Sequence, residues 1–174
     1  MNLPEGCTAI DDGAFSSCRN LTSINLPNTI THIGANGFSQ CIKLPVEFLP
    51  NELEYIGTDA FAGCPYVTCR VIPKKVKNIG QRAFAYCTGL TSIILPEDLS
   101  EIESLVFLGC SNLTSATLPK NLTEIPYGLF RETGLLSIDL PDGVVEINSY
   151  GFYGTKLTSI DLPENLTYIG TGAF

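Results

Sequence analysis

The chain of 174 residues contains 44% hydrophobic residues and nine Phe, and its formal net charge is −8. This composition excludes a disordered chain, because enough apolar side chains are present to form a sizeable core. The excess of carboxylates repels phosphate backbones, so nucleic acid is not an expected partner. No apolar run approaches the roughly 20 residues of a membrane-spanning helix, so membrane insertion is not expected either.

A repeat with a period of 23 residues organises the whole chain. Phe recurs in five steps of 23 residues and then two of 22, and a Pro that follows Leu or Ile keeps the same steps. Such a period is typical of stacked units that bury their apolar faces only against each other. We therefore predict one solenoid domain over residues 1–174, of about seven and a half units. The repeated Phe are Phe15, Phe38, Phe61, Phe84, Phe107, Phe130, Phe152 and Phe174.

Each unit reads LxxIxLPxxLxxIGxxAFxxCxx. The opening LxxIxL alternates inward and outward side chains, so it predicts a β-strand, which we call a rung. The apolar pair after Pro, such as Ile30 and Ile33, predicts a second extended run. Gly then leads into AFxxC, which is too short for more than a single helical turn. In chain order, rungs 1 to 7 are residues 21–26, 44–49, 67–72, 90–95, 113–118, 135–140 and 157–162.

These units resemble the BspA-type class of leucine-rich repeat, because the Leu-Pro, Ile-Gly and Ala-Phe pairs recur in register along essentially the entire chain. The resemblance implies an α/β-type repeat solenoid. It would be a right-handed coil with a parallel β-sheet on its concave side and short turns or single helical turns on its convex side. It also implies a bacterial or protozoal surface or secreted protein with an adhesive role, whose ligand is a protein such as a host or extracellular-matrix protein.

The two ends of the chain carry no atypical capping repeat, and the sequence has no signal peptide or anchor domain. We therefore expect the chain to be a piece of a longer protein. Copies that associate through their open ends, as homo-oligomers, would cover the same apolar faces.

The outward positions of the rungs are the candidate partner-binding residues. In the middle of the chain they are apolar, and Phe48, Val71 and Ile94 are expected to form an exposed stripe, which usually marks a partner site on a solenoid. Asp139 and Asp161 would be polar contacts. A purely structural spacer or self-assembly unit, acting through its ends, is the alternative function. The candidate residues are Val46, Phe48, Cys69, Val71, Ser92, Ile94, Ser115, Thr117, Asp139 and Asp161.

Two charged residues occupy inward positions of rungs 2 and 3. Glu47 and Arg70 stand where other rungs carry Ile, and the same phase turns Val46 and Cys69 outward. We expect the two charges to pair one rung apart, since a buried charge alone is costly. The alternative is a one-residue slip of both strands, favoured by a preceding Pro, which would release the charges and turn the apolar outward residues inward.

The sequence contains no catalytic or cofactor-binding constellation. It has no GxSxG, GxGxxG, Walker loop, HExxH or CxxC motif, and its single His, His32, lies at a variable position where a solvated side chain is expected. We therefore expect a non-enzymatic protein that needs no cofactor.

Three further groups of residues recur or cluster. Five of the seven Cys follow the unit period, and we expect a column of buried free thiols instead of disulfides or a zinc site. Glu101, Glu124 and Glu146 are expected to form a column of solvated carboxylates, with a cation site as the alternative. Half of the basic residues lie between positions 70 and 82. They predict a solvated loop or, alternatively, a contact for an acidic partner or sulfated sugar.

Overall fold

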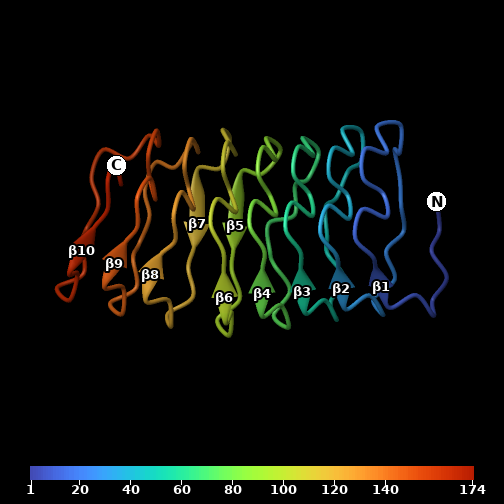
Figure 1. Ribbon diagram of the computed structural model, residues 1–174, viewed down its shortest axis with the longest axis horizontal. Coiled ribbons are helices and arrows are strands. Elements are labelled where there is room, and N and C mark those ends of the chain that lie inside the picture. Colours follow the sequence, from blue (N-terminus) through green and yellow to red (C-terminus); the bar gives the residue numbers. More distant parts are fainter.

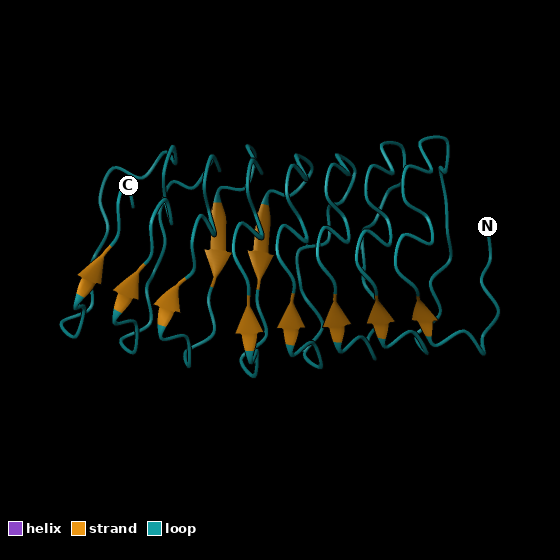
Figure 2. Ribbon diagram, in the orientation of Figure 1, coloured by secondary structure: helices purple, strands orange, loops and turns teal.

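The computed structural model describes all residues, 1–174, as a stack of coils. Figure 1 shows the coils following one another in chain order along the long axis, with the two termini at opposite ends. The structure contains ten short strands and no helix (Figure 2). The strands are β1 (Ala9–Ile10), β2 (His32–Ile33), β3 (Tyr55–Ile56), β4 (Asn78–Ile79), β5 (Ser92–Ile94), β6 (Glu101–Ile102), β7 (Ser115–Thr117), β8 (Glu124–Ile125), β9 (Glu146–Ile147) and β10 (Tyr168–Ile169).

The single helical turns expected around each Phe do not form, so the α/β assignment is wrong and the fold is a parallel-strand β-solenoid. Residues two before and two after each Phe are left-handed, as at Asn36 (φ 55°) and Gln40 (φ 59°). The N–H groups alternate in direction: Ser39 donates to Asn36 O within its own coil, whereas Phe38 donates to Ala60 O of the next coil. A helical turn would keep these bonds within the coil, whereas this arrangement joins neighbouring coils.

The second extended run, after Pro, forms the longer parallel ladder of the molecule. Its strands pair in the order β1-β2-β3-β4-β6 and, separately, β8-β9-β10. Ile faces Ile at each step, as Ile33 with Ile56, and these Ile side chains lie in the core of all but the last coil. The residue before each of these Ile is variable and at least partly exposed, and His32 is exposed there, as expected.

On the rung side, regular strand pairing is limited to β5 and β7, in rungs 4 and 5. Elsewhere the pairing is reduced to isolated bridges, such as Val46 with Val67 and Val71 with Ile94. The predicted continuous sheet of rungs is therefore present only in part. Figure 2 shows the two ladders on different sides of the stack, with their arrows pointing in opposite directions.

The Phe rings form the predicted column. All eight are stacked, with centroids of successive rings 5.2 to 6.0 Å apart and planes within 17° of parallel. The six inner rings are fully buried. Since each ring buries on the order of 150 Å² or more, this column accounts for much of the apolar contact between coils.

The periodic cysteines form a second column of free thiols next to the rings. Each inner thiol donates to the carbonyl oxygen of the Phe one coil earlier, at 3.0 Å from Cys41 to Phe15 and from Cys64 to Phe38. In the shorter unit, Thr133 takes the Cys position, and its hydroxyl donates instead to Phe130 O of its own coil (2.9 Å). The thiols therefore satisfy polar backbone groups inside the stack.

Candidate partner-binding face

The outward residues of rungs 4 and 5 lie as the sequence predicts. Ile93 is in the core and Ile94 is 46% exposed, while Ser115 and Thr117 are exposed on the neighbouring strand. The register pairs Ser92 with Ser115 and Ile94 with Thr117, so these side chains form two short rows on one surface.

Rungs 2 and 3 differ from this pattern. Val46 and Cys69, expected at the surface, are 5% and 1% exposed and belong to the core. Glu47 and Arg70, expected inside, are exposed. Both expectations are wrong, because burying Val and Cys avoids the desolvation of two charges.

The rearrangement reverses the spacing of the inward residues. A regular rung buries Leu90, Ile93 and Leu95, whereas rung 2 buries Leu44, Val46 and Leu49. In a regular rung, two consecutive outward residues come before the middle inward residue, whereas in rung 2 they come after it. We call these two residues the outward pair. The rung keeps its length, and the rest of the unit stays in phase.

This shifted pair keeps the apolar stripe at the surface. Phe48 is 82% exposed and Val71 is 55% exposed, and Val71 is bridged to Ile94 of the next rung. The alternative interpretation, a one-residue slip of both strands, is therefore also wrong for Phe48 and Val71. It was correct in predicting that both charges lie at the surface. Neither sequence interpretation described these two rungs completely.

A groove of about 740 Å³ follows the stripe between rungs 2 and 4. Phe48 also borders a second groove, of about 350 Å³, between rungs 1 and 2. No backbone hydrogen bond joins rungs 1 and 2, whose inward spacings differ. The larger groove is lined by Asn28, Glu47, Phe48, Leu49, Asn51, Thr68, Arg70, Val71, Pro73 and Ile94.

The expected ion pair between Glu47 and Arg70 is absent. The Nε of Arg70 donates to Ser92 Oγ at 2.9 Å, and neither charge takes part in an ion pair. In contrast, three of the neighbouring basic residues do have carboxylate partners: Lys75 with Glu52, Lys77 with Asp98 and Arg82 with Asp59. Arg70 and Lys74 are the cations of this cluster that have none.

Asp139 and Asp161 are exposed on rungs 6 and 7, away from the residues that line the groove. The structure thus brings Phe48, Val71 and Ile94 together, with Ser92 close enough to bond Arg70. It does not bring the two Asp to the same groove. The favoured sequence interpretation placed Arg70 and Glu47 inside, and only the alternative slip placed them at the surface. The alternation from Leu44 to Val46 was the signal for their exposure.

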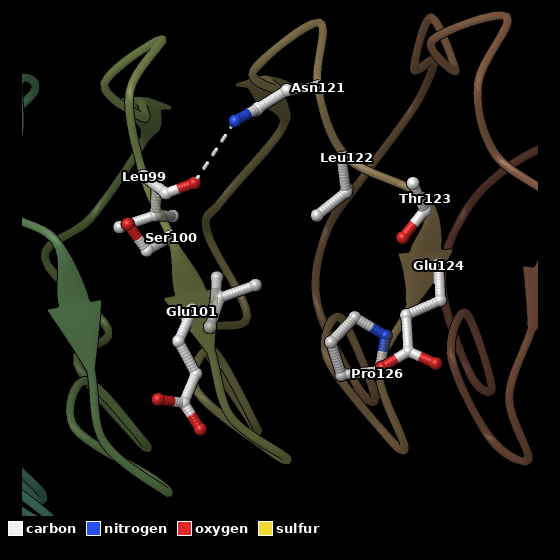
Figure 3. Close-up of a pocket in the computed structure, with 9 residues that line it drawn as sticks. Leu99, Ser100, Glu101, Asn121, Leu122, Thr123, Glu124 and Pro126 are labelled. Atoms are coloured by element: carbon white, nitrogen blue, oxygen red, sulfur yellow. Dashed lines mark hydrogen bonds between the residues drawn. The ribbon is translucent and has the colours of Figure 1, made fainter.

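The longer ladder is interrupted between β6 and β8. In other coils the residue after Ile donates its N–H to the preceding coil, as Glu103 does to Ile79 O (3.0 Å). Pro126 occupies this position in the next coil and has no N–H, so the bond to Ile102 O is missing. A cavity of about 210 Å³ opens at the break, and Figure 3 shows Glu101 and Glu124 extending from the two coils beside it.

The expected column of glutamates is therefore incomplete. Glu124 faces Glu146 in register, but Glu101 faces Asn78. The Glu101 carboxylate accepts a bond from Asn78 Nδ2 (2.8 Å), and that of Glu124 accepts one from Asn148 Nδ2 (3.3 Å). No group of three or more His, Cys, Asp or Glu is arranged to hold a metal ion.

The recurring LxxIxL segment in stacked units of 22 and 23 residues is that of a leucine-rich repeat protein. The model of the BspA type leucine rich repeat region matches six copies, over residues 1–110 and 54–174. The chain belongs to the BspA-type leucine-rich repeat family. No enzymatic family is indicated, and no helix in the structure is long and apolar enough to cross a membrane.

Solved bacterial structures share this fold. A leucine-rich repeat protein from Bacteroides ovatus matches with a TM-score of 0.89 and 30% identity, over 98% of this chain and 47% of that one. The T. pallidum leucine-rich repeat protein matches with a TM-score of 0.74 and 28% identity, over 98% and 72%. A leucine-rich cell surface protein from Faecalibacterium prausnitzii matches with a TM-score of 0.58 and 24% identity, over 98% of this chain and 59% of that one. At this identity the match shows the fold alone.

The chain thus spans about half the length of the B. ovatus protein. No curated protein matches it.

Proposed function

We propose that this chain is a non-enzymatic protein-interaction module that binds a protein partner through the outward side of its rungs. By the resemblance to the family, we take this side to be the concave one. The proposal rests on Phe48, an aromatic residue 82% exposed between two grooves. Exposed aromatic side chains beside preformed pockets contribute much of the binding energy in interfaces, so a chain that maintains one in a groove is suited to binding.

Phe48, Val71 and Ile94 are the apolar anchors of this proposal. Ser92, Ser115 and Thr117 continue the surface as hydrogen-bonding groups, and Asp139 and Asp161 extend it toward the C-terminus. The family supports a protein that is secreted or displayed at the cell surface, where the partner would be a host or extracellular-matrix protein. An adhesive role is part of the same proposal.

The test compares surface variants on a panel of purified extracellular-matrix proteins. Phe48→Ser and Val71→Ser should weaken binding about tenfold or more, as expected for central interface residues, without changing the melting temperature. Leu136→Ser is the matched control, because Leu136 is an apolar rung residue that is 57% exposed but outside the groove. Equal binding by all three variants, or no binding of the wild-type chain to any protein of the panel, would contradict the proposal.

A further inference from the structure

We propose that the groove between rungs 2 and 3 takes an extended polypeptide segment, which pairs with residues 47–49 as an added strand. An apolar side chain of this segment would lie between Phe48 and Val71, and an acidic one would lie beside Arg70. The inference rests on the proposed function, since it specifies the form and charge of the partner for the same groove.

The backbone of rung 2 offers unpaired groups to such a strand. The N–H and C=O groups of Glu47 and Phe48 have no hydrogen-bond partner in the chain. Neither do the N–H groups of Cys69, Arg70 and Val71 on the opposite edge. A row of unpaired N–H and C=O groups is a template for a further strand, and domains that bind peptides by strand addition use this feature.

The chain cannot close this opening by itself. Val46 is bridged to Val67 and not to its periodic equivalent Cys69, so the two edges lose their register after this bridge. On the other side of the coils, the pairing of β2 with β3 remains regular and fixes the spacing of the stack. The groove is therefore already open before any partner binds, which lowers the cost of binding.

The side chains of the groove specify an apolar contact. Phe48, Val71 and Ile94 project from successive rungs, and Leu49 and Pro73 are buried at its base. A volume of about 740 Å³ is in the range that accommodates a few side chains.

The charges specify an acidic neighbour on one side only. Arg70 lines the groove and has no carboxylate partner. Glu47 on the opposite edge would repel an acidic side chain, so the carboxylate belongs on the rung 3 side. On a chain of net charge −8, the free guanidinium of Arg70 is a local attraction for an anionic segment.

A library of random short linear peptides, displayed on phage and selected on the folded chain, tests this inference. Selected peptides should combine an apolar residue with a nearby Asp or Glu. A synthetic selected peptide should bind Leu136→Ser as tightly as wild type, and it should bind Phe48→Ser and Arg70→Ser at least about tenfold more weakly. It should also slow the amide exchange of Glu47, Phe48 and Arg70, and N-methylation of its backbone should abolish binding, because strand pairing needs its N–H groups.

Several results would overturn the inference. These are a library that yields no binder, peptides that bind Phe48→Ser equally well, and peptides that bind without protecting the amides of rungs 2 and 3. The proposed function fails separately. A matrix protein could bind and lose affinity on Phe48→Ser while no linear peptide is selected. The groove would then bind a folded surface. This result would support the proposed function and contradict the added strand.

Discussion

The thiol of Cys87 donates a hydrogen bond to the carbonyl oxygen of Phe61, 26 residues earlier, with 3.1 Å between Sγ and O. The same bond joins Cys110 to Phe84. The bond connects the two columns of the solenoid, rings and thiols, across neighbouring coils. It requires a protonated thiol, because a thiolate has no proton to donate and would be desolvated in the core.

Stability should therefore fall at alkaline pH. Burial raises the pKa of Cys41 to about 11 and the pKa values of Cys64, Cys69 and Cys110 to about 12, above the ordinary value of 9.0 that we take for the unfolded chain. Between these values the unfolded chain has lost thiol protons that the folded chain still holds. The stability that the protonated thiols contribute is thus complete below about pH 9. Above that pH, the free energy of unfolding decreases by about 1.4 kcal/mol per pH unit for each thiol, until the folded pKa of that thiol is reached.

Urea unfolding from pH 8 to pH 11 measures this decrease. Since Tyr and Lys titrate in the same range, Cys64→Ala is the control, and its free energy of unfolding should decline less steeply than that of the wild-type chain. Equal slopes for the two chains would show that this thiol is not protonated and buried as described.

Gly80 illustrates how closely the coils approach each other. A Cβ added there would lie 2.5 Å from the backbone nitrogen of Thr58, one coil earlier. Gly80→Ala should force the coils apart and cost about 3 kcal/mol in urea unfolding, at the upper end of overpacking penalties. Gly6→Ala is the matched control, because no atom lies within 4 Å of the new Cβ, and it should change stability by less than about 0.5 kcal/mol. Equal effects of the two substitutions would contradict the packing described.

The break beside Pro126 should be repairable. Pro126→Gly restores an N–H that can donate to Ile102 O, and pairing of β6 with β8 would then bring Thr123 N–H to Ser100 O. Hydrogen exchange at residues 123 and 126 should become slow. Pro163→Gly removes the rigidity of a Pro elsewhere without adding a ladder bond, so Pro126→Gly should be the more stable of the two by about 1 kcal/mol. Fast exchange at both positions would mean that another contact keeps the coils apart.

The ring column could be predicted because two unrelated signals, Phe and Leu-Pro, keep the same period, and stacking then fixes the neighbours of each ring. The turns around each Phe could not be predicted in the same way. Their left-handed residues include Arg82, Tyr86 and Leu105, side chains that rarely adopt positive φ and give no local signal for it.

The binding face was predictable in its outline and not in its detail. Phe48, Val71 and Ile94 are exposed as expected, but the consensus spacing assigned the wrong phase to Val46 and Cys69. The chain either buries a charge or shifts the outward pair, and the desolvation cost of the charge decides which. This cost cannot be read from a repeat pattern. The groove depends on this shift, so it could not be located from the period alone.

The reactivity of Cys69 tests the account of this face most directly, because its thiol is buried only if rung 3 has the shifted pair. The folded Phe48→Cys variant should be treated with a maleimide, and the modified sites should be identified by peptide mass spectrometry. We predict rapid modification of the thiol introduced at position 48 and none at Cys69 until the chain is unfolded. Modification of Cys69 as rapid as that at position 48 would place Cys69 outward and Arg70 inward, and would contradict the groove on which the proposed function rests.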